Sequence, residues 1–388
     1  MTTTPHPNLP FLRWHAMLRE AGFIIPVIIA YAHLRGVTFA EFMAIQSMYM
    51  VAMLVLGPII SPLADTYGRR PAAIVGSVFW TLGHIVMWQG YGWQAFAIAE
   101  LTLAIGIAAY RPAVDALLYD SLASVGKQQH HYAALTNLSS RQAYAGAGAM
   151  LVGGWLFAQH PSAPILASIA ANLGMVAVAF KMHEAPYAKP IAHPTYANMW
   201  RQAWAALSHP ATRWVVILPG FITGSTITLF WSVQPLWQAA GLGTAAASAL
   251  LTVQFILRGV AASQCPRLLA SLGHRRSFML CIAVVAAGFA GMALLPWWAS
   301  YPLFVAGTAL GYILADTMGN DMLHHSVPSS IRSTAAGGYS LVGKLMGITS
   351  MGATSALYPQ LGLSGTLLVV GTVAMALATW ALTHLRAR

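Results

Sequence analysis

The sequence has few charged residues, and acidic residues are especially scarce. Only 7% of its 388 residues are Asp, Glu, Lys or Arg, and nine are acidic. A soluble domain carries roughly 25% charged residues, so this composition excludes an ordinary water-soluble protein. Cysteine is also scarce: Cys265 and Cys281 lie in or beside apolar segments and predict packing residues, not a disulfide framework.

Motifs of enzymes and metal sites are missing as well. The 14 histidines form no HExxH pattern and no Cys/His cluster, and the chain has no phosphate-binding loop or nucleophile motif. We therefore expect no enzyme activity, no bound metal and no cofactor. One alternative of a different class stays open, a membrane enzyme that uses His324, His325 and Asp321 on a lipid-linked substrate.

What the chain does contain is long hydrophobic runs, since 57% of its residues are hydrophobic. A helix of about 20 apolar residues crosses a hydrocarbon layer of about 30 Å. The sequence predicts an all-α membrane protein with twelve such helices. Their approximate ranges are 18–35, 41–63, 72–90, 94–118, 139–158, 163–182, 213–238, 245–266, 277–295, 300–325, 334–357 and 364–384.

Basic residues are concentrated on one side of these predicted helices. Most of the 20 Lys and Arg residues fall at the termini or in even-numbered loops, while Arg35 lies in an odd-numbered loop. Lys and Arg are retained in the cytoplasm, so this asymmetry predicts that both termini are cytoplasmic. The net charge of +11 then faces an anionic inner leaflet and does not indicate nucleic-acid binding. We expect a multi-pass protein of the inner (cytoplasmic) membrane.

The two halves of the chain resemble each other. With Gly106 aligned on Gly311, Ser121 matches Ser326 and Lys127 matches Arg332. Such parallel repeats are a known transporter architecture. We therefore predict an N-terminal six-helix bundle over 1–183, a cytoplasmic linker over 184–211 and a C-terminal six-helix bundle over 212–388, the bundles being related by a pseudo-twofold axis.

One loop carries a family resemblance. The segment from Leu63 to Pro71 reads LADTYGRRP, which resembles the signature loop between helices two and three of the major facilitator superfamily. The segment from Ala116 to Leu122 is similar to the end of helix four in a bacterial efflux-like branch of that superfamily. The resemblance implies the superfamily fold and transport by alternating access.

The same resemblance implies a gating latch on the cytoplasmic side. Arg69 would pair with a carboxylate at the end of helix four, where Asp120 stands, and Asp65 would accept hydrogen bonds from a helix N-terminus. In the second repeat Ala270 and His325 replace the two acids, so only the first half is expected to keep the full charged latch. The predicted latch residues are Asp65, Gly68, Arg69, Arg70 and Asp120.

Ionisable groups inside predicted membrane helices are functional candidates because their burial in lipid is costly. Glu100 has no basic neighbour within a helical turn, which makes it the first candidate for carrying a proton, although a structural hydrogen bond is the alternative. Further candidates for proton coupling are Asp316, Asp321 and His324. Predicted residues of the substrate cavity are Arg111, Asp115, Thr223, Trp231, Gln234, Gln254, Arg258, Asn320 and Lys344.

Two pairs of these predicted cavity residues have simpler alternatives. Arg111 and Asp115 are four residues apart and can pair with each other on one helix. Arg258 and Lys344 can instead extend their charged ends to the membrane surface.

Together these observations predict a proton-coupled secondary transporter that exports a small organic molecule. Import of a small polar or zwitterionic solute is the alternative, because the candidate cavity residues carry both signs of charge. The expected partners are the substrate, protons and the lipid bilayer. We expect a monomer, powered by the proton gradient.

Overall fold

The computed structural model describes residues 6–186, 201, 204, 207–208, 213–326 and 332–385. It divides the chain into two compact units. Unit 1 comprises Met1–Val37, Ala52–His193 and Thr244–Thr252, and unit 2 comprises Thr38–Val51, Pro194–Gly243 and Val253–Arg388. Two long helices, α3 (Phe39–Ile60) and α11 (Thr244–Leu294), contribute residues to both units.

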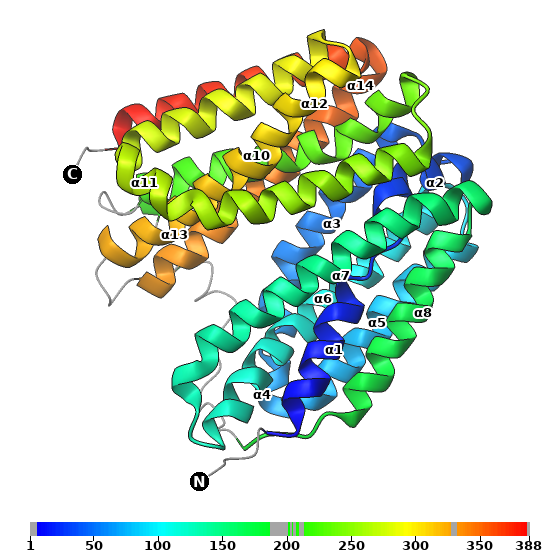
Figure 1. Ribbon diagram of the computed structural model, residues 1–388, viewed down its shortest axis with the longest axis vertical. Coiled ribbons are helices and arrows are strands. Elements are labelled where there is room, and N and C mark those ends of the chain that lie inside the picture. Colours follow the sequence, from blue (N-terminus) through cyan, green and yellow to red (C-terminus); the bar gives the residue numbers. More distant parts are fainter. Residues whose placement is uncertain are drawn as a thin grey trace. The chain divides into compact units, whose positions relative to one another are not determined.

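Unit 1 is a bundle of long helices joined by short connections (Figure 1). Helix α5 packs between α6 and α8, and α1 packs against α7 and α8. Its complete elements, in chain order, are α1 (Asn8–Glu20), η1 (Ile25–Val27), α2 (Ile28–Leu34), α4 (Leu63–Tyr67), α5 (Arg69–Gln89), α6 (Gly92–Ala123), η2 (Gln128–His130), α7 (His131–Gln159) and α8 (Ala163–Lys181).

In unit 2, helix α10 is the central element, because it packs against α12, α13 and α14 and against the short π-helix η3. The described part of this unit contains helices only. Its complete elements are α10 (Arg213–Ala239), α12 (Trp297–Val305), η3 (Ala306–Gly311), α13 (Tyr312–Ser326) and α14 (Arg332–His384).

Nine helical segments of the described residues are long and apolar enough to cross a membrane. Two of them, Thr244–Leu294 and Gly338–His384, are far longer than one crossing requires. Each contains a glycine with positive φ, Gly273 at 71° and Gly362 at 64°, where the helix bends sharply. These bends lie in the predicted loops after helices eight and eleven.

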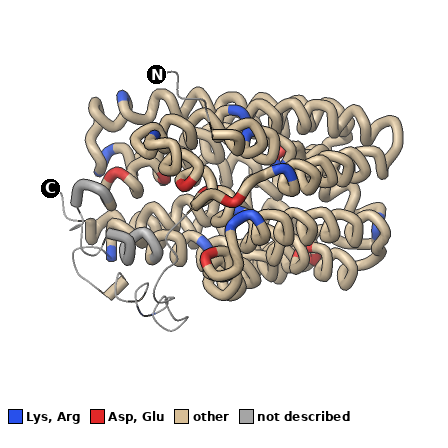
Figure 2. The backbone as a smooth tube through the Cα atoms, turned by 90° about the horizontal axis from the view of Figure 1, so that it is seen from below, with Lys and Arg blue, Asp and Glu red and all other residues tan. Residues whose placement is uncertain are grey.

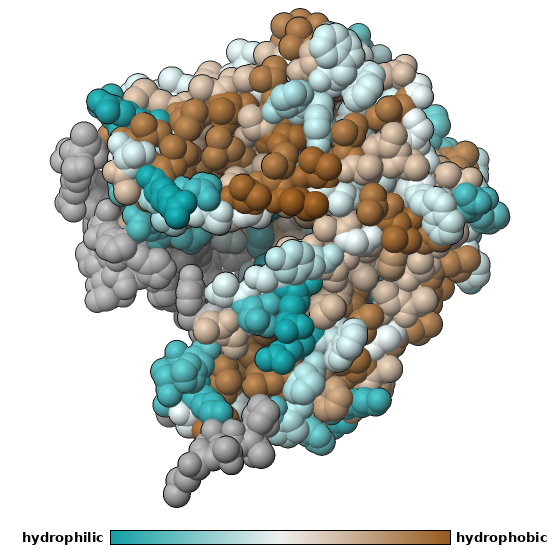
Figure 3. Space-filling model, viewed as in Figure 1, coloured by the Kyte–Doolittle hydropathy of each residue, from teal (hydrophilic) through white to brown (hydrophobic). Residues whose placement is uncertain are grey.

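Apolar side chains remain exposed along the helices, as expected for surfaces that contact lipid. On α11 the exposed residues include Val253, Ile256 and Val260. Much of the visible surface of unit 2 is hydrophobic (Figure 3), and charged residues are sparse along the chain (Figure 2). The position of Trp237 at a helix end would assign it to the membrane interface. Instead its side chain is 1% exposed and packs against Tyr301 and Phe304.

The first span begins earlier than its predicted range of 18–35. It covers Asn8–Leu34 and is interrupted after Glu20, where α1 ends and the chain turns into η1. Hydropathy underestimates this span because its first half contains Asn8 and His15, both of which are buried by neighbouring helices. The consequence is that Glu20 lies near the middle of the span and not at its edge.

Candidate functional site

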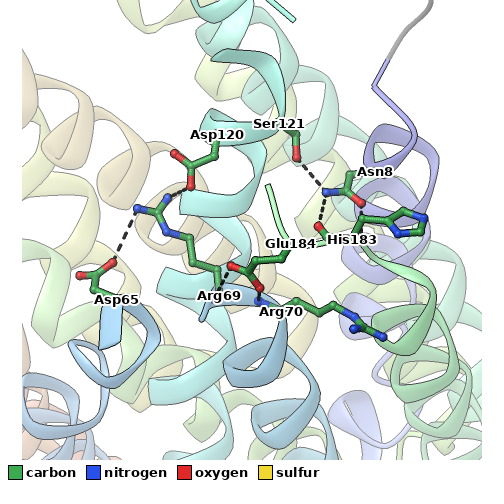
Figure 4. Close-up of polar contacts among 8 residues, drawn as sticks. All are labelled: Asn8, Asp65, Arg69, Arg70, Asp120, Ser121, His183 and Glu184. Atoms are coloured by element: carbon green, nitrogen blue, oxygen red, sulfur yellow. Dashed lines mark hydrogen bonds and ion pairs between the residues drawn. The ribbon is translucent and has the colours of Figure 1, made fainter. Parts of the chain in front are cut away.

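The predicted latch residues come together at one end of unit 1. Gly68 has a φ of 111°, a backbone conformation that favours glycine, and this turn separates α4 from α5. Immediately after the turn, the guanidinium of Arg69 forms an ion pair with Asp120 near the end of α6 (Figure 4). Its second terminal nitrogen lies 3.6 Å from Asp65. One cation therefore joins α4, α5 and α6.

A residue outside the predicted latch completes this network. The two carboxylate oxygens of Glu184 accept hydrogen bonds from the backbone N–H groups of Arg69, at 2.8 Å, and Arg70, at 2.7 Å. These groups belong to the first turn of α5, where a carboxylate is favoured by the helix dipole. Asp65 was expected to cap a helix in this way, but within unit 1 Glu184 caps α5 and Asp65 binds Arg69.

Arg70 and Asn8 secure the segment that carries Glu184. The side chain of Arg70 donates to the carbonyl of Phe180 at 2.9 Å. Asn8, which is completely buried, exchanges two hydrogen bonds with the backbone of His183 and donates a third to the hydroxyl of Ser121. The start of the chain, the end of α6 and the segment after α8 are thus joined through side-chain hydrogen bonds (Figure 4).

Unit 1 also contains charges at membrane depth. Arg19 and Glu20 form an ion pair at 2.7 Å where α1 ends, in the middle of the first span. Broken helices with charged groups are typical of transporter binding sites. On α6, Glu100 is buried with 6% of its surface exposed, which agrees with a position inside the bundle.

Unit 2 contains a cavity of about 470 Å³, a size typical of small-molecule sites. Its lining comes from α10, α11, η3, α13 and α14, together with Met50 of α3. Five of the predicted cavity residues line it: Thr223, Trp231, Gln254, Arg258 and Lys344. Asp316, predicted for proton coupling, lines it too.

The charged groups of this cavity have distinct surroundings. Tyr339 donates a hydrogen bond of 2.8 Å to a carboxylate oxygen of Asp316. The guanidinium of Arg258 lies 4.3 Å from the centre of the Tyr312 ring, in a cation–π contact. Arg258 lies about midway between Thr244 and the bend at Gly273, so it is far from the helix ends that would let it reach the membrane surface.

The π-helix η3 shapes one wall of the cavity. Its Thr308 donates to the carbonyl of Phe304 at 2.7 Å and accepts a hydrogen bond of 3.1 Å from the side-chain amide of Gln254. Such π segments frequently occur at functional sites. Thr308 of η3 and Tyr312, the first residue of α13, both line the cavity and contact Gln254 and Arg258 of α11.

Close packing of α10 on α14 forms the opposite wall. A Cβ on Gly224 would lie 2.4 Å from the carbonyl oxygen of Gly343, so only glycine permits this approach. Gly220 packs equally tightly on Val342. Small residues allow helices in membranes to pack at such distances. The contact places Lys344, the neighbour of Gly343, in the lining of the cavity.

The other predicted residues lie outside this cavity. Arg111 and Asp115 are exposed on α6, and no ion pair joins them in the described structure. Gln234 is buried in α10, and the side chain of Asn320 is exposed and donates to the backbone of Asp316. Two residues remain. Asp321 pairs with His274 at 2.9 Å, and the side chain of His324 lies outside the described residues.

Sequence reasoning missed several residues that bind predicted ones, among them Glu184 in unit 1 and Tyr339 in unit 2. A weak signal existed for Glu184, since it is one of only nine acidic residues. Tyr339 has no comparable signal, because an aromatic residue in a glycine-rich helix is typical of packing.

Comparison with known proteins agrees with this architecture. The family model of the Major Facilitator Superfamily matches residues 17–351. No curated protein matches the sequence. Solved structures of known transporters share the fold at low sequence identity. The nucleoside transporter NupG has a TM-score of 0.80 and 14% identity, covering 98% of this chain and 100% of that chain.

An auto-inhibited peptide transporter of the POT family has a TM-score of 0.75 and 14% identity, covering 98% of this chain and 97% of that one. A bacterial homologue of the human lysosomal transporter Spinster, in an inward-facing and unoccupied conformation, has a TM-score of 0.71 and 12% identity, covering 97% and 95%. The chain belongs to the Major Facilitator Superfamily. Its family and its structural neighbours point to a transporter.

Proposed function

We propose that the protein is a proton-coupled secondary transporter that exports a small organic molecule across the inner membrane by alternating access. In this proposal it works as a monomer with both termini in the cytoplasm. In this proposal α11 and α14 each cross the membrane twice and α7 crosses once, which gives twelve spans in two bundles of six joined by the linker 184–211.

One observation carries the proposal, the cavity lined by Arg258, Lys344 and Asp316 in the middle of apolar helices. Charged groups at this depth are costly unless they serve a substrate or an ion. A cavity of about 470 Å³ accommodates a molecule of one or two rings. The efflux direction rests on the similarity of the segment from Ala116 to Leu122 to an efflux-like branch.

The proposed proton carrier is Glu100, because it is an ionisable residue buried inside a membrane helix, and such residues are functional candidates. The Arg69–Asp120 latch is the proposed gate, held in one state of the cycle and broken in the other.

Transport in liposomes tests this function. Purified protein is screened for ligands that raise its melting temperature, using nucleosides, amino acids, dipeptides, aromatic carboxylates and cationic dyes. Each hit is then followed across proteoliposomes with a pH gradient of either sign, which separates efflux from import. We expect transport to follow the gradient and Glu100→Gln to abolish that dependence.

The matched control is Glu41→Gln. Glu41 is an acidic residue of α3. Its carboxylate accepts hydrogen bonds from the backbone N–H and the hydroxyl of Thr38, at the start of that helix. Unchanged gradient dependence in Glu100→Gln would refute the assignment of the proton carrier. Absence of any gradient-driven movement for every ligand that binds would refute the proposed function.

A further inference from the structure

We propose that the cavity of unit 2 selects a small organic monoanion built on a planar ring, an aromatic or heteroaromatic carboxylate with a ring hydroxyl or N–H group. This inference rests on the proposed function, because it names the substrate class of the same cavity. Three features of the lining support the proposed substrate class: the charge balance, the aromatic walls, and two polar atoms that have no hydrogen-bond partner among the described residues.

The charge balance favours an anion. Two basic side chains, Arg258 and Lys344, and one acidic side chain, Asp316, line the cavity. Asp316 already accepts a hydrogen bond from Tyr339 at 2.8 Å, which stabilises its carboxylate within the protein. Arg258 has no carboxylate within ion-pair distance among the described residues, although its face is covered by the ring of Tyr312 at 4.3 Å.

A guanidinium stacked in this way keeps its N–H edges available. Arginine presents these donors as a planar fork that matches the two oxygens of a carboxylate. A carboxylate of the ligand would therefore pair with Arg258 in this cavity.

The walls favour a flat ring. Phe230 and Phe255 approach each other with ring centres 6.1 Å apart, and Trp231 lies beside Phe230 at 4.9 Å. All three line the cavity. Aromatic side chains bind flat rings through offset and edge-to-face contacts, which aliphatic ligands cannot form.

Two polar atoms of the lining residues are left unsatisfied. Gln254 is 99% buried, and Thr308 binds its amide nitrogen. The hydroxyl of Thr308 already donates to Phe304, so it can only accept from Gln254, and this fixes which end of the amide is oxygen. That oxygen, Oε1, has no hydrogen-bond partner among the described residues.

The indole nitrogen of Trp231 is likewise buried without a partner in the described structure. A buried polar atom without a partner costs about 1–3 kcal/mol, so a ligand that satisfies it gains specificity. Gln254 requires a donor and Trp231 requires an acceptor. A ring hydroxyl can donate to the first or accept from the second, and a ring N–H group can donate to the first.

Binding of 4-hydroxybenzoate to the purified full-length protein tests the proposal, measured by calorimetry. Matched probes each remove one feature: 4-hydroxybenzyl alcohol lacks the charge, cyclohexanecarboxylate lacks the aromatic ring, and benzoate lacks the hydroxyl. We expect 4-hydroxybenzoate to bind best and each of the three to bind about tenfold or more weakly. Equal binding of the neutral alcohol would overturn the charge argument.

Variants of two cavity residues assign the contacts. Arg258→Gln should weaken binding of 4-hydroxybenzoate by about tenfold to a hundredfold, and Arg258→Lys should restore part of the loss. Gln254→Leu should weaken 4-hydroxybenzoate while leaving benzoate unchanged, because benzoate has no hydroxyl to lose. The control Arg267→Gln changes an exposed arginine of the same helix whose one hydrogen-bond partner among the described residues is Gln264, and this variant should bind 4-hydroxybenzoate like the wild type.

The outcomes also separate this inference from the proposed function. Preferential binding and transport of phenylalanine or uridine would overturn the anionic substrate class and leave the transport function intact. If 4-hydroxybenzoate binds in an Arg258-dependent way yet never crosses proteoliposomes in either direction, the binding inference stands and the transport function fails. Equal affinity of wild type and Arg258→Gln for 4-hydroxybenzoate would overturn the proposal even where transport occurs.

Discussion

The ion pair between Arg69 and Asp120 makes a quantitative prediction about stability. The side chains of Arg69 and Asp120 are only 14% and 9% exposed, so the pair is largely removed from water. Deleting one member of a buried pair leaves an uncompensated charge and costs about 3–5 kcal/mol. Arg69→Ala also leaves Asp120 beside Asp65, a second carboxylate that the same cation held at 3.6 Å. We therefore expect Arg69→Ala to destabilise the protein by about 3 kcal/mol.

A double-mutant cycle isolates the pair. Arg69→Ala, Asp120→Ala and the double variant are compared by melting temperature in one detergent, where about 3 kcal/mol corresponds to a decrease of roughly 6–12 °C. Because both single changes break the same contact, the double variant should lose little more than the worse single variant. Additive losses would refute the ion pair as a stabilising contact. Arg141→Ala is the matched control, since its side chain is exposed and, in the part of the chain that the structure describes, binds only Asn137 on the same helix.

Two further predictions concern unit 2. His274→Ala should lower the free energy of unfolding by about 1 kcal/mol or less, because the side chains of His274 and Asp321 are 42% and 31% exposed and an exposed pair is weak. A melting curve near pH 6 measures the loss of stability. A loss as large as that of the Arg69–Asp120 pair would contradict the reasoning. Gly224→Val should separate α10 from α14, because its Cβ would lie 2.4 Å from the oxygen of Gly343, and we expect a large loss of folded protein in size-exclusion chromatography. The control Gly259→Val, at a helical position with open space around its Cβ, should retain far more, and equal yields would refute the packing argument.

The latch shows what a local motif can predict. The family pattern predicted that Arg69 lies beside Asp120, and the structure places these two side chains in contact. Asp65 was expected at a helix N-terminus and lies 3.6 Å from Arg69, while the gating role stays a prediction. Glu184 escaped prediction because it binds backbone N–H groups of residues more than a hundred positions away. A helix N-terminus attracts any nearby carboxylate, and the sequence does not reveal which one the fold brings there.

The first span shows where hydropathy fails. Asn8 and His15 made the segment before residue 18 look too polar to enter the membrane. In the structure Asn8 binds Ser121 and His183, and His15 bonds with Ser77 at 3.0 Å. Hydropathy treats every polar side chain as unsatisfied, but a polar group that finds a partner inside a bundle costs little. Such partners belong to the tertiary structure.

In unit 2, pattern reasoning found cavity residues better than it found their contacts. Ionisable and aromatic residues in apolar helices were enough to select Trp231, Arg258 and Asp316. The contact of Asp316 with Tyr339 was not predictable, because the spacing within one helix cannot say which side chain of a neighbouring helix lies opposite.

The second repeat has a contact of its own at the place that corresponds to the latch. Alignment pairs Arg69 with His274, and each follows a glycine of positive φ, Gly68 at 111° and Gly273 at 71°. The acid aligned with Asp120 is lost at position 325, yet His274 still finds a carboxylate, because Asp321 lies one helical turn earlier on α13. The contact between Arg69 and Asp120 agrees with the pairing expected in the first half, while the gating role stays a prediction, and the second repeat has a contact of its own. Arginine stays charged at every physiological pH, whereas histidine is a cation only when protonated. The contact in unit 1 therefore contains a permanently charged arginine, whereas the more exposed contact in unit 2 has a histidine in the same place.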